Sequence, residues 1–405
     1  MFRSIRRPDA LVITLAAAGI LMVTMGIRQS LGLFISPINS STGLGIVSIS
    51  FALAIGQIAW GAIQPIAGAC ADHYGPRGVL IAGVVVMALG CAITPYMGSG
   101  FGLTVSLGLL AAIGSGAGSF SVLIGAAAQR LPIEARGTAA GVINAGGSFG
   151  QFVFAPLAQK LIQSIGWVGA MWSMAILTLT ALPLIGKLTK GKPVAHAHAE
   201  TDMGLKKTVI GSLTNRSYIL LHLGFFTCGF HIAFLVTHLP GEVDLCGLPP
   251  SVAGWSLAII GLANIVGSLL AGSWVGKYRS KYILAVMYGS RALLILWYLA
   301  MPRTEWTFYL FAAGLGVTWL ATVPPTATIV GKLFGNRYLG TLFGLTLFTH
   351  QIGGFLGAWL GGVAISRFGD YNWMWYADIA LAVLAALVNL PIREARIPKA
   401  MPAAA

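Results

Sequence analysis

The residues of this chain best suited to chemistry are two ionisable side chains inside long apolar runs. Arg28 lies in the run 10–35 and His231 in the run 217–240. Placing a charged side chain in a bilayer costs roughly 2.5–3.5 kcal/mol by insertion scales, so such a residue is a candidate functional group. A guanidinium binds a carboxylate through two parallel hydrogen bonds, and histidine titrates near physiological pH. We predict that Arg28 binds an anionic substrate and that His231 contributes to binding and to proton coupling.

Further polar side chains in apolar runs extend this candidate site. They are Asn144, Gln151, Thr349, His350 and Gln351. We predict that all five contact the substrate and that His350 is a second proton-coupling group. A substrate that carries its own proton, or exchange of one anion for another, would serve instead of a histidine.

Two more ionisable residues lie in apolar runs, Arg291 and Asp378. At a helical rise of 1.5 Å per residue, they lie about 15 Å and about 10 Å from the same membrane surface. A long arginine side chain can bridge that difference in depth. We predict that Arg291 and Asp378 form a structural ion pair.

The composition indicates that the segments carrying these residues lie in a lipid bilayer rather than in water. The 405 residues are 57% hydrophobic and only 9% charged, whereas a soluble domain carries about 25% charged residues. Twelve runs are about long enough to cross a bilayer, and backbone groups in lipid must be paired within a helix. We therefore expect an all-α membrane protein with spans at 10–35, 46–69, 79–97, 101–128, 138–164, 167–187, 217–240, 251–275, 282–301, 305–331, 340–365 and 371–391.

The positive charges set the orientation of these spans. Of the 25 Lys and Arg residues, 20 lie in segments that face the side of the N-terminus, three lie in the opposite loops and two lie within spans. Cytoplasmic loops carry the excess of Lys and Arg. We predict a multi-pass protein of the cell inner membrane with both termini cytoplasmic. This distribution accounts for the net charge of +14 without a nucleic acid partner.

The two halves of the chain repeat each other at an offset of about 203 residues. Parallel repeats of six spans are typical of transporters with a substrate site between two bundles. We expect an N-terminal bundle (1–187), a cytoplasmic linker (188–216), a C-terminal bundle (217–391) and a cytoplasmic tail (392–405). The matched segments are Gly26-Ile27-Arg28 with Gly229-Phe230-His231, Gly137 and Gly141 with Gly340 and Gly344, and Gly68 with Gly272.

The loop after the second span carries a recognisable motif formed by Gly68, Asp72, Gly75 and Arg77. It resembles the G-x-x-x-D-R-x-G-R-R loop of the major facilitator superfamily, which implies two bundles that rock against each other in alternating access. Negative charge is favourable at a helix N-terminus, and a span begins near Gly340 on the same side. We therefore predict that Asp72 holds the two bundles together when the inner gate is closed.

Two further segments narrow the resemblance. Residues 26–34 and 229–240 are similar to those of bacterial relatives of the monocarboxylate and oxalate–formate transporters, in which a cation lies late in the first span, as Arg28 does. Asn264 and Ser268 stand where those carriers have an Asp-x-x-x-Arg pair. The resemblance implies a carrier of a small organic anion, such as a carboxylate, moved with protons or by exchange.

Two other functions were weighed against an anion carrier. An exporter of amphipathic or drug-like compounds with the same fold stays open as the alternative. An enzyme is not expected, because the sequence shows no nucleophile–base pair of suitable spacing. We expect no cofactor and no metal site, although His196 and His198 lie close together in the linker. The expected partners are a small-molecule substrate, protons and membrane lipid, and we expect a monomer.

Overall fold

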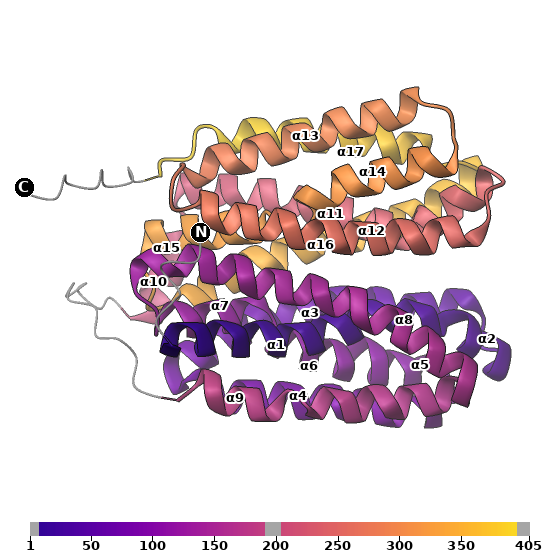
Figure 1. Cartoon of the computed structure of the whole chain (residues 1–405), viewed down its shortest axis with the longest axis horizontal. Helices are drawn as coiled ribbons and strands as arrows, with labels where there is room; N and C mark the ends of the chain where they lie inside the picture. The colour runs from indigo at the N-terminus through magenta and orange to yellow at the C-terminus, as the bar shows by residue number, and fades with distance from the viewer. Residues whose placement is uncertain (1–7, 191–203, 395–405) are drawn as a thin grey trace, which may run out of the picture.

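The computed structural model describes residues 8–190 and 204–394, and these ranges fold almost entirely into helices. Figure 1 shows long helices side by side in two bundles, with both ends of the described chain at the same end of the molecule. We call that end the termini side. The predicted all-α membrane fold, with twelve spans in two pseudo-symmetric bundles, is confirmed.

The N-terminal bundle contains six spans, several of them assembled from more than one helix. The first span, α1 and η2, continues into α2. The helices are α1 (Pro8–Ser30), η2 (Leu31–Phe34), α2 (Ile35–Thr42), α3 (Ile46–Tyr74), α4 (Pro76–Ile93), η3 (Thr94–Tyr96), α5 (Gly100–Leu103), the π-helical η4 (Thr104–Ala111), α6 (Ala112–Ala117), α7 (Phe120–Ala128), α8 (Ile133–Leu179) and α9 (Leu182–Leu188).

The C-terminal bundle follows the same plan after a short helix, α10, inside the predicted linker. The helices are α10 (Leu205–Leu213), α11 (Arg216–Leu245), α12 (Pro250–Trp274), α13 (Ser280–Ala300), α14 (Glu305–Thr318), α15 (Val323–Phe334), α16 (Leu339–Phe368) and α17 (Asn372–Asn389). His196, His198 and the residues after 394 lie outside the described residues.

The 47-residue helix α8 contains two spans. Gly166, inside it, has a non-helical backbone with φ 73°, and there the chain turns back along the bundle (Figure 1). Gly369 has φ 74° and ends α16 before α17 begins. Both angles lie in the region that glycine adopts without a steric penalty. The two turns are 203 residues apart, so they occupy equivalent places in the repeat.

Two helices, α16 and the first half of α8, each pack against the opposite bundle. Ten segments of the described chain are long and apolar enough to cross a membrane, and they do not include α16 or the first half of α8. α16 packs along α3 of the other bundle, and α8 packs along α12. These helices face protein rather than lipid over much of their length, so they can carry more polar side chains.

The fourth and tenth spans are interrupted, which the sequence did not predict. α6 ends at Ala117 and α7 begins at Phe120, while α14 ends at Thr318 and α15 begins at Val323. Each break frees backbone carbonyl groups that need other donors. The Thr24 hydroxyl donates to the Gly118 carbonyl oxygen at 3.0 Å.

Candidate functional site

Arg28 lies where α1 faces α3. Its Nη2 donates to the Gln57 side-chain oxygen at 2.5 Å, and its guanidinium carbon lies 4.5 Å from the ring centroid of Trp60. The side chain is partly exposed. Within residues 8–190 and 204–394, no carboxylate pairs with Arg28 and no acceptor engages its Nε or Nη1. Arg28 therefore keeps donors and a positive charge available to a ligand.

A chain of side-chain hydrogen bonds carries this site across to the other bundle. The Gln57 oxygen that accepts from Arg28 also accepts from Gln351 Nε2 at 2.9 Å. The Gln351 oxygen lies 2.9 Å from His350 Nδ1. We call Arg28, Gln57, Gln351 and His350 the central polar chain. It joins α1 and α3 of one bundle to α16 of the other.

His231 has a different environment from the one its repeat position suggests. Its Nδ1 lies 2.5 Å from Asp378 Oδ2, and the two side chains are 1% and 0% exposed. The pair links α11 to α17 inside the C-terminal bundle, and the His231 ring lies 6.0 Å from the Trp319 ring at the α14–α15 break. His231 is thus one half of a buried His–Asp pair rather than a member of the central polar chain.

The predicted ion pair between Arg291 and Asp378 is wrong. Arg291 donates instead to the carbonyl oxygens of Thr318 and Trp319, the latter at 2.6 Å. It also reaches the Thr318 hydroxyl at 3.2 Å and the Cys228 sulfur at 3.4 Å. The break between α14 and α15 leaves those carbonyls without helical donors, and a buried guanidinium satisfies them. The two side chains therefore have different partners, since Asp378 lies against His231.

Asn144 joins the bundles rather than pointing free into a cavity. Its Nδ2 donates to the Ser268 hydroxyl and to the Leu320 carbonyl oxygen, both at 2.7 Å. Asn264 donates to the Ser148 hydroxyl and accepts from the Leu320 N–H at 3.0 Å. These bonds connect α8 to α12 and to the start of the α14–α15 break.

Gln151 and Thr349 lie apart from one another. Gln151 is partly buried beside Gly261 of α12. Thr349 pairs with His222 Nδ1 at 2.7 Å, between α16 and α11. Of the seven side chains predicted for the substrate site, Arg28, His350 and Gln351 come together in one chain. Asn144 and Gln151 face α12, while His231 and Thr349 face partners within the C-terminal bundle.

Asp72 lies at the N-terminus of α16. Its Oδ2 accepts from the Thr341 N–H and the Thr341 hydroxyl, both at 2.8 Å, and Gln129 donates to its Oδ1 at 3.3 Å. Gly68, one turn earlier on α3, packs against the Gly340 backbone, and a Cβ there would lie 2.4 Å from its carbonyl oxygen. Gly75 separates α3 from α4, and Arg77 in the first turn of α4 is exposed.

The comparison with protein families decides the identity of this fold. The model of the Major Facilitator Superfamily matches residues 16–358 and 246–404. The chain belongs to this superfamily. It is a multi-pass membrane transporter whose two bundles meet at the central polar chain.

Individual relatives of this transporter are distant but cover most of its length. It is 23% identical over 380 residues to an uncharacterised MFS-type transporter, YcxA, of Bacillus subtilis, covering 90% of each chain. It is 26% identical over 384 residues to monocarboxylate transporter 13 of Rattus norvegicus, covering 91% of this chain and 86% of that one. The solved proton:xylose symporter XylE shares the fold, with a TM-score of 0.74, 16% identity and coverage of 95% and 96%.

Sequence reasoning missed Gln57 and the side chains around the α14–α15 break. Gln57 is a single uncharged amide in an apolar run, so it does not stand out as a buried charge does. The break itself had a visible sign, because Pro324 and Pro325 open α15 in the middle of the tenth span. Proline lacks the N–H that a helix interior requires, so this pair marks where a new helix starts.

Proposed function

We propose that this transporter moves a small organic anion, a carboxylate, across the inner membrane by alternating access. One observation carries the proposal, which is the positive charge of Arg28 with two donor nitrogens free between the bundles. An arginine offers a planar fork that matches the two oxygens of a carboxylate. The 26% identity to a monocarboxylate transporter supports the same substrate class.

Trp60 orients the Arg28 side chain in the proposed binding site. Its ring lies under the guanidinium, and a cation over an indole face is held in one orientation by the ring quadrupole. Gln57 takes one hydrogen of Nη2, so one complete fork stays free, formed by the second Nη2 hydrogen together with Nε or Nη1. A substrate carboxylate would bind that fork, close to Gln351 and His350 of α16.

The buried His231–Asp378 pair is the candidate proton carrier. The His231 Nδ1 and Asp378 Oδ2 atoms lie 2.5 Å apart and both side chains are buried, so a proton carried by the pair would be shielded from water. The pair lies beside Trp319, next to Leu320, whose backbone binds Asn144 of the other bundle. A change in the protonation of the pair would change the structure of the α14–α15 break. That break holds Leu320, whose contact with Asn144 of the other bundle must open during transport. His350, at the end of the central polar chain, is the second candidate.

The experiment that tests the proposed function is uptake into proteoliposomes across a panel of labelled carboxylates, with and without an inward-acid pH gradient. We expect saturable uptake of a small carboxylate by the native transporter and little by Arg28→Gln. Arg367→Gln is the matched control, because Arg367 is an exposed arginine at the far end of α16.

The outcomes separate the proposal from its alternative. If no carboxylate is taken up, and if amphipathic cations or neutral compounds are expelled equally by the native transporter and by Arg28→Gln, the protein is an exporter and Arg28 is structural. A gradient that accelerates net uptake but not exchange would support proton coupling. Equal net uptake with and without the gradient would point to anion exchange.

A further inference from the structure

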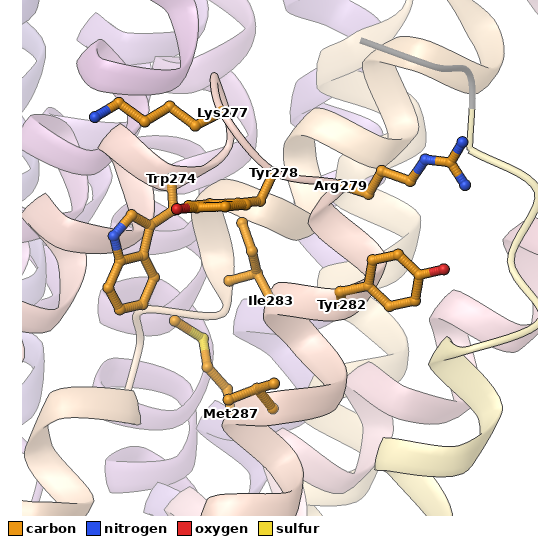
Figure 2. Close-up of a pocket in the computed structure, with 8 residues that line it drawn as sticks. Trp274, Lys277, Tyr278, Arg279, Tyr282, Ile283 and Met287 are labelled. Carbon is orange, nitrogen blue, oxygen red and sulfur yellow. The ribbon is translucent and has the colours of Figure 1, made fainter.

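A hollow opens in the C-terminal bundle at the termini side of α12 and α13. It has a volume of ≈ 750 Å³ and is lined by Trp274, Lys277, Tyr278, Arg279, Tyr282, Ile283, Val286 and Met287. Figure 2 shows the aromatic rings of Trp274 and Tyr278 across its upper part, with Met287 below and Lys277 and Arg279 on opposite sides. This hollow lies away from the central polar chain, so a molecule bound in it would be different from the transported substrate.

A second, apolar hollow adjoins the first along α12, α13 and α14. With a volume of ≈ 130 Å³, it shares Trp274, Val286 and Met287 with the first and reaches Thr318 at the end of α14. Gly267 lies at its floor, where a Cβ would meet the Val317 carbonyl oxygen. Val286, between the two hollows, is 70% exposed. The combined shape is a basic and aromatic mouth that leads into an apolar channel along α12, α13 and α14.

The charges at the mouth have no acidic partner among the described residues. Glu394, whose carboxylate binds the start of α13, already has partners: it pairs with Lys332 at 2.5 Å and accepts hydrogen bonds from the backbone N–H groups of Ser280 and Lys281. Lys281 donates to the Leu390 carbonyl oxygen. Lys277 and Arg279 thus present positive charge with nothing in the described protein to balance it.

We propose that this groove binds an anionic phospholipid, with its headgroup at the basic mouth, where Lys277 and Arg279 lie on opposite sides, and one acyl chain along Val286 and Met287. Basic pockets between membrane helices on the cytoplasmic side bind anionic headgroups, and Trp and Tyr are favoured at the level of the headgroups. The apolar groove below the mouth has the polarity of a lipid chain. A bound lipid would tie α12 to α13 and α14, next to the break that contacts Asn144.

The test is native mass spectrometry of the full-length purified transporter, titrated with phosphatidylglycerol or phosphatidylcholine of identical acyl chains. The charge variant is Lys277→Gln with Arg279→Gln, and the groove variant is Val286→Trp. The matched control is Lys206→Gln with Lys207→Gln, which removes two exposed positive charges from α10 on the same side.

We expect the native transporter to prefer phosphatidylglycerol and the charge variant to bind it at least about tenfold more weakly, since each basic residue contributes about 1 kcal/mol near an anionic headgroup. Val286→Trp should weaken both lipids, and the control should match the native protein. An equal loss in the control would mean nonspecific attraction and would overturn the proposal. So would complete displacement of the lipid by soluble glycerol phosphate together with unchanged binding to Val286→Trp, because the groove would then contribute nothing.

Discussion

Two arginines inside the membrane are satisfied in different ways, and the difference separates binding from structure. Arg291 is buried and donates to four acceptors, two of them carbonyl oxygens at a helix break. Arg28 is partly exposed and donates to one acceptor, Gln57. Buried donors in folded proteins are nearly all paired. Arg291 therefore belongs to the framework, whereas the free donors of Arg28 suit a ligand that comes and goes.

The first prediction concerns Arg28 and the affinity for the substrate anion. Arg28→Lys keeps the charge but loses the planar fork, so binding should weaken. Arg28→Gln should weaken it further, by roughly tenfold to a hundredfold, because a hydrogen bond to a charged group contributes about 1.5–3 kcal/mol. Calorimetry on the purified protein with the carboxylate found by uptake measures this. If Arg28→Gln binds the carboxylate with unchanged affinity, Arg28 is not part of the binding site and its charge gives no reason to expect an anionic substrate.

The second prediction concerns the His231–Asp378 pair. Removing one partner leaves the other buried without its charge or hydrogen bond, which costs about 3–5 kcal/mol. We expect Asp378→Leu and His231→Leu each to lower the thermal unfolding temperature more than the double variant does. We expect the double variant to keep exchange but to lose acceleration by a pH gradient.

Asp370→Asn serves as the control for that experiment, since Asp370 precedes α17 and its carboxylate accepts hydrogen bonds from the backbone and side-chain N–H groups of Asn372, the first residue of that helix. If a pH gradient still accelerates uptake by the double variant, the pair is not the proton carrier, and His350 or the substrate itself carries the proton. If each single variant unfolds at the same temperature as the native protein, the His231–Asp378 interaction contributes nothing to stability.

At this scale the sequence identified which residues are unusual but not which partners they have. Arg28 stood out because a charge in an apolar run is rare. The pairing of His231 with Asp378 depends on how α11 is rotated about its axis, and that rotation is set by packing between helices 147 residues apart. Counting residues gives the depth of a side chain in the membrane but not the direction in which it points.

At the scale of helices, the repeated glycines form the contact between the bundles. Gly68 meets Gly340 where α3 crosses α16, and Gly272 meets Gly141 where α12 crosses α8. A Cβ on Gly272 would lie 2.7 Å from the Gly141 Cα. Small residues let membrane helices approach closely. Since the two crossings are related by the repeat, the sequence match between the halves reflects one contact used twice.

These crossings close the termini side of the structure. The hydrogen bonds between the bundles in the described chain run from the Gln57–Gln351 pair toward the Asp72–Thr341 pair, and from Asn144 and Ser148 to α12 and the break. Alternating access requires these contacts to separate. The two crossings differ in one respect, because Asp72 adds a charged cap at α16, whereas Gly276 occupies the equivalent place in the second half.

The third prediction is that a side chain at the α8–α12 crossing opens the termini side. Gly272→Ala places a methyl group against the backbone of α8, so the closed arrangement should lose population. Distances between spin labels at positions 73 and 277, measured by double electron–electron resonance in a background without native thiols, should lengthen. Gly276→Ala is the matched control, since its nearest neighbour would be 3.8 Å away. An unchanged distance distribution in Gly272→Ala would show that this crossing does not limit closure.

The fourth prediction concerns Asp72. Asp72→Asn removes the negative charge at the α16 N-terminus, where such a charge contributes about 0.3–1 kcal/mol or more when partly buried. We expect the same label pair to report more of the open state, and transport to slow. Substrate affinity in the state that binds it should persist, because the residue lies at the end of α3 and not in the central polar chain. A large loss of affinity with an unchanged distance distribution would place Asp72 in the binding site instead.

At the scale of the whole molecule, hydropathy and charge predicted the fold because the bilayer leaves few alternatives. Twelve spans and a common side for both ends of the described chain follow from segment length and from the positions of Lys and Arg. What the sequence did not reveal was internal to the bundles. The two broken spans and the closed termini side depend on packing between helices that are distant in sequence, and hydropathy averaged over a span does not record it.

The last prediction is that the termini side is cytoplasmic, and two natural cysteines test it. Cys246 lies just after α11 at the opposite side and Cys70 lies near the termini-side end of α3; both are partly exposed, whereas Cys91 and Cys228 are buried. A membrane-impermeant maleimide added to intact spheroplasts should label Cys246 and spare Cys70. Burial and the nearby Glu242 carboxylate raise the pKa of Cys246. Since the thiolate is the reactive form, less of it is present at neutral pH, and labelling should accelerate as the pH rises toward that raised pKa. Cys246→Ser identifies the labelled site. Labelling of Cys70 from outside, with Cys246 reached only after lysis, would invert the topology and place the basic segments outside.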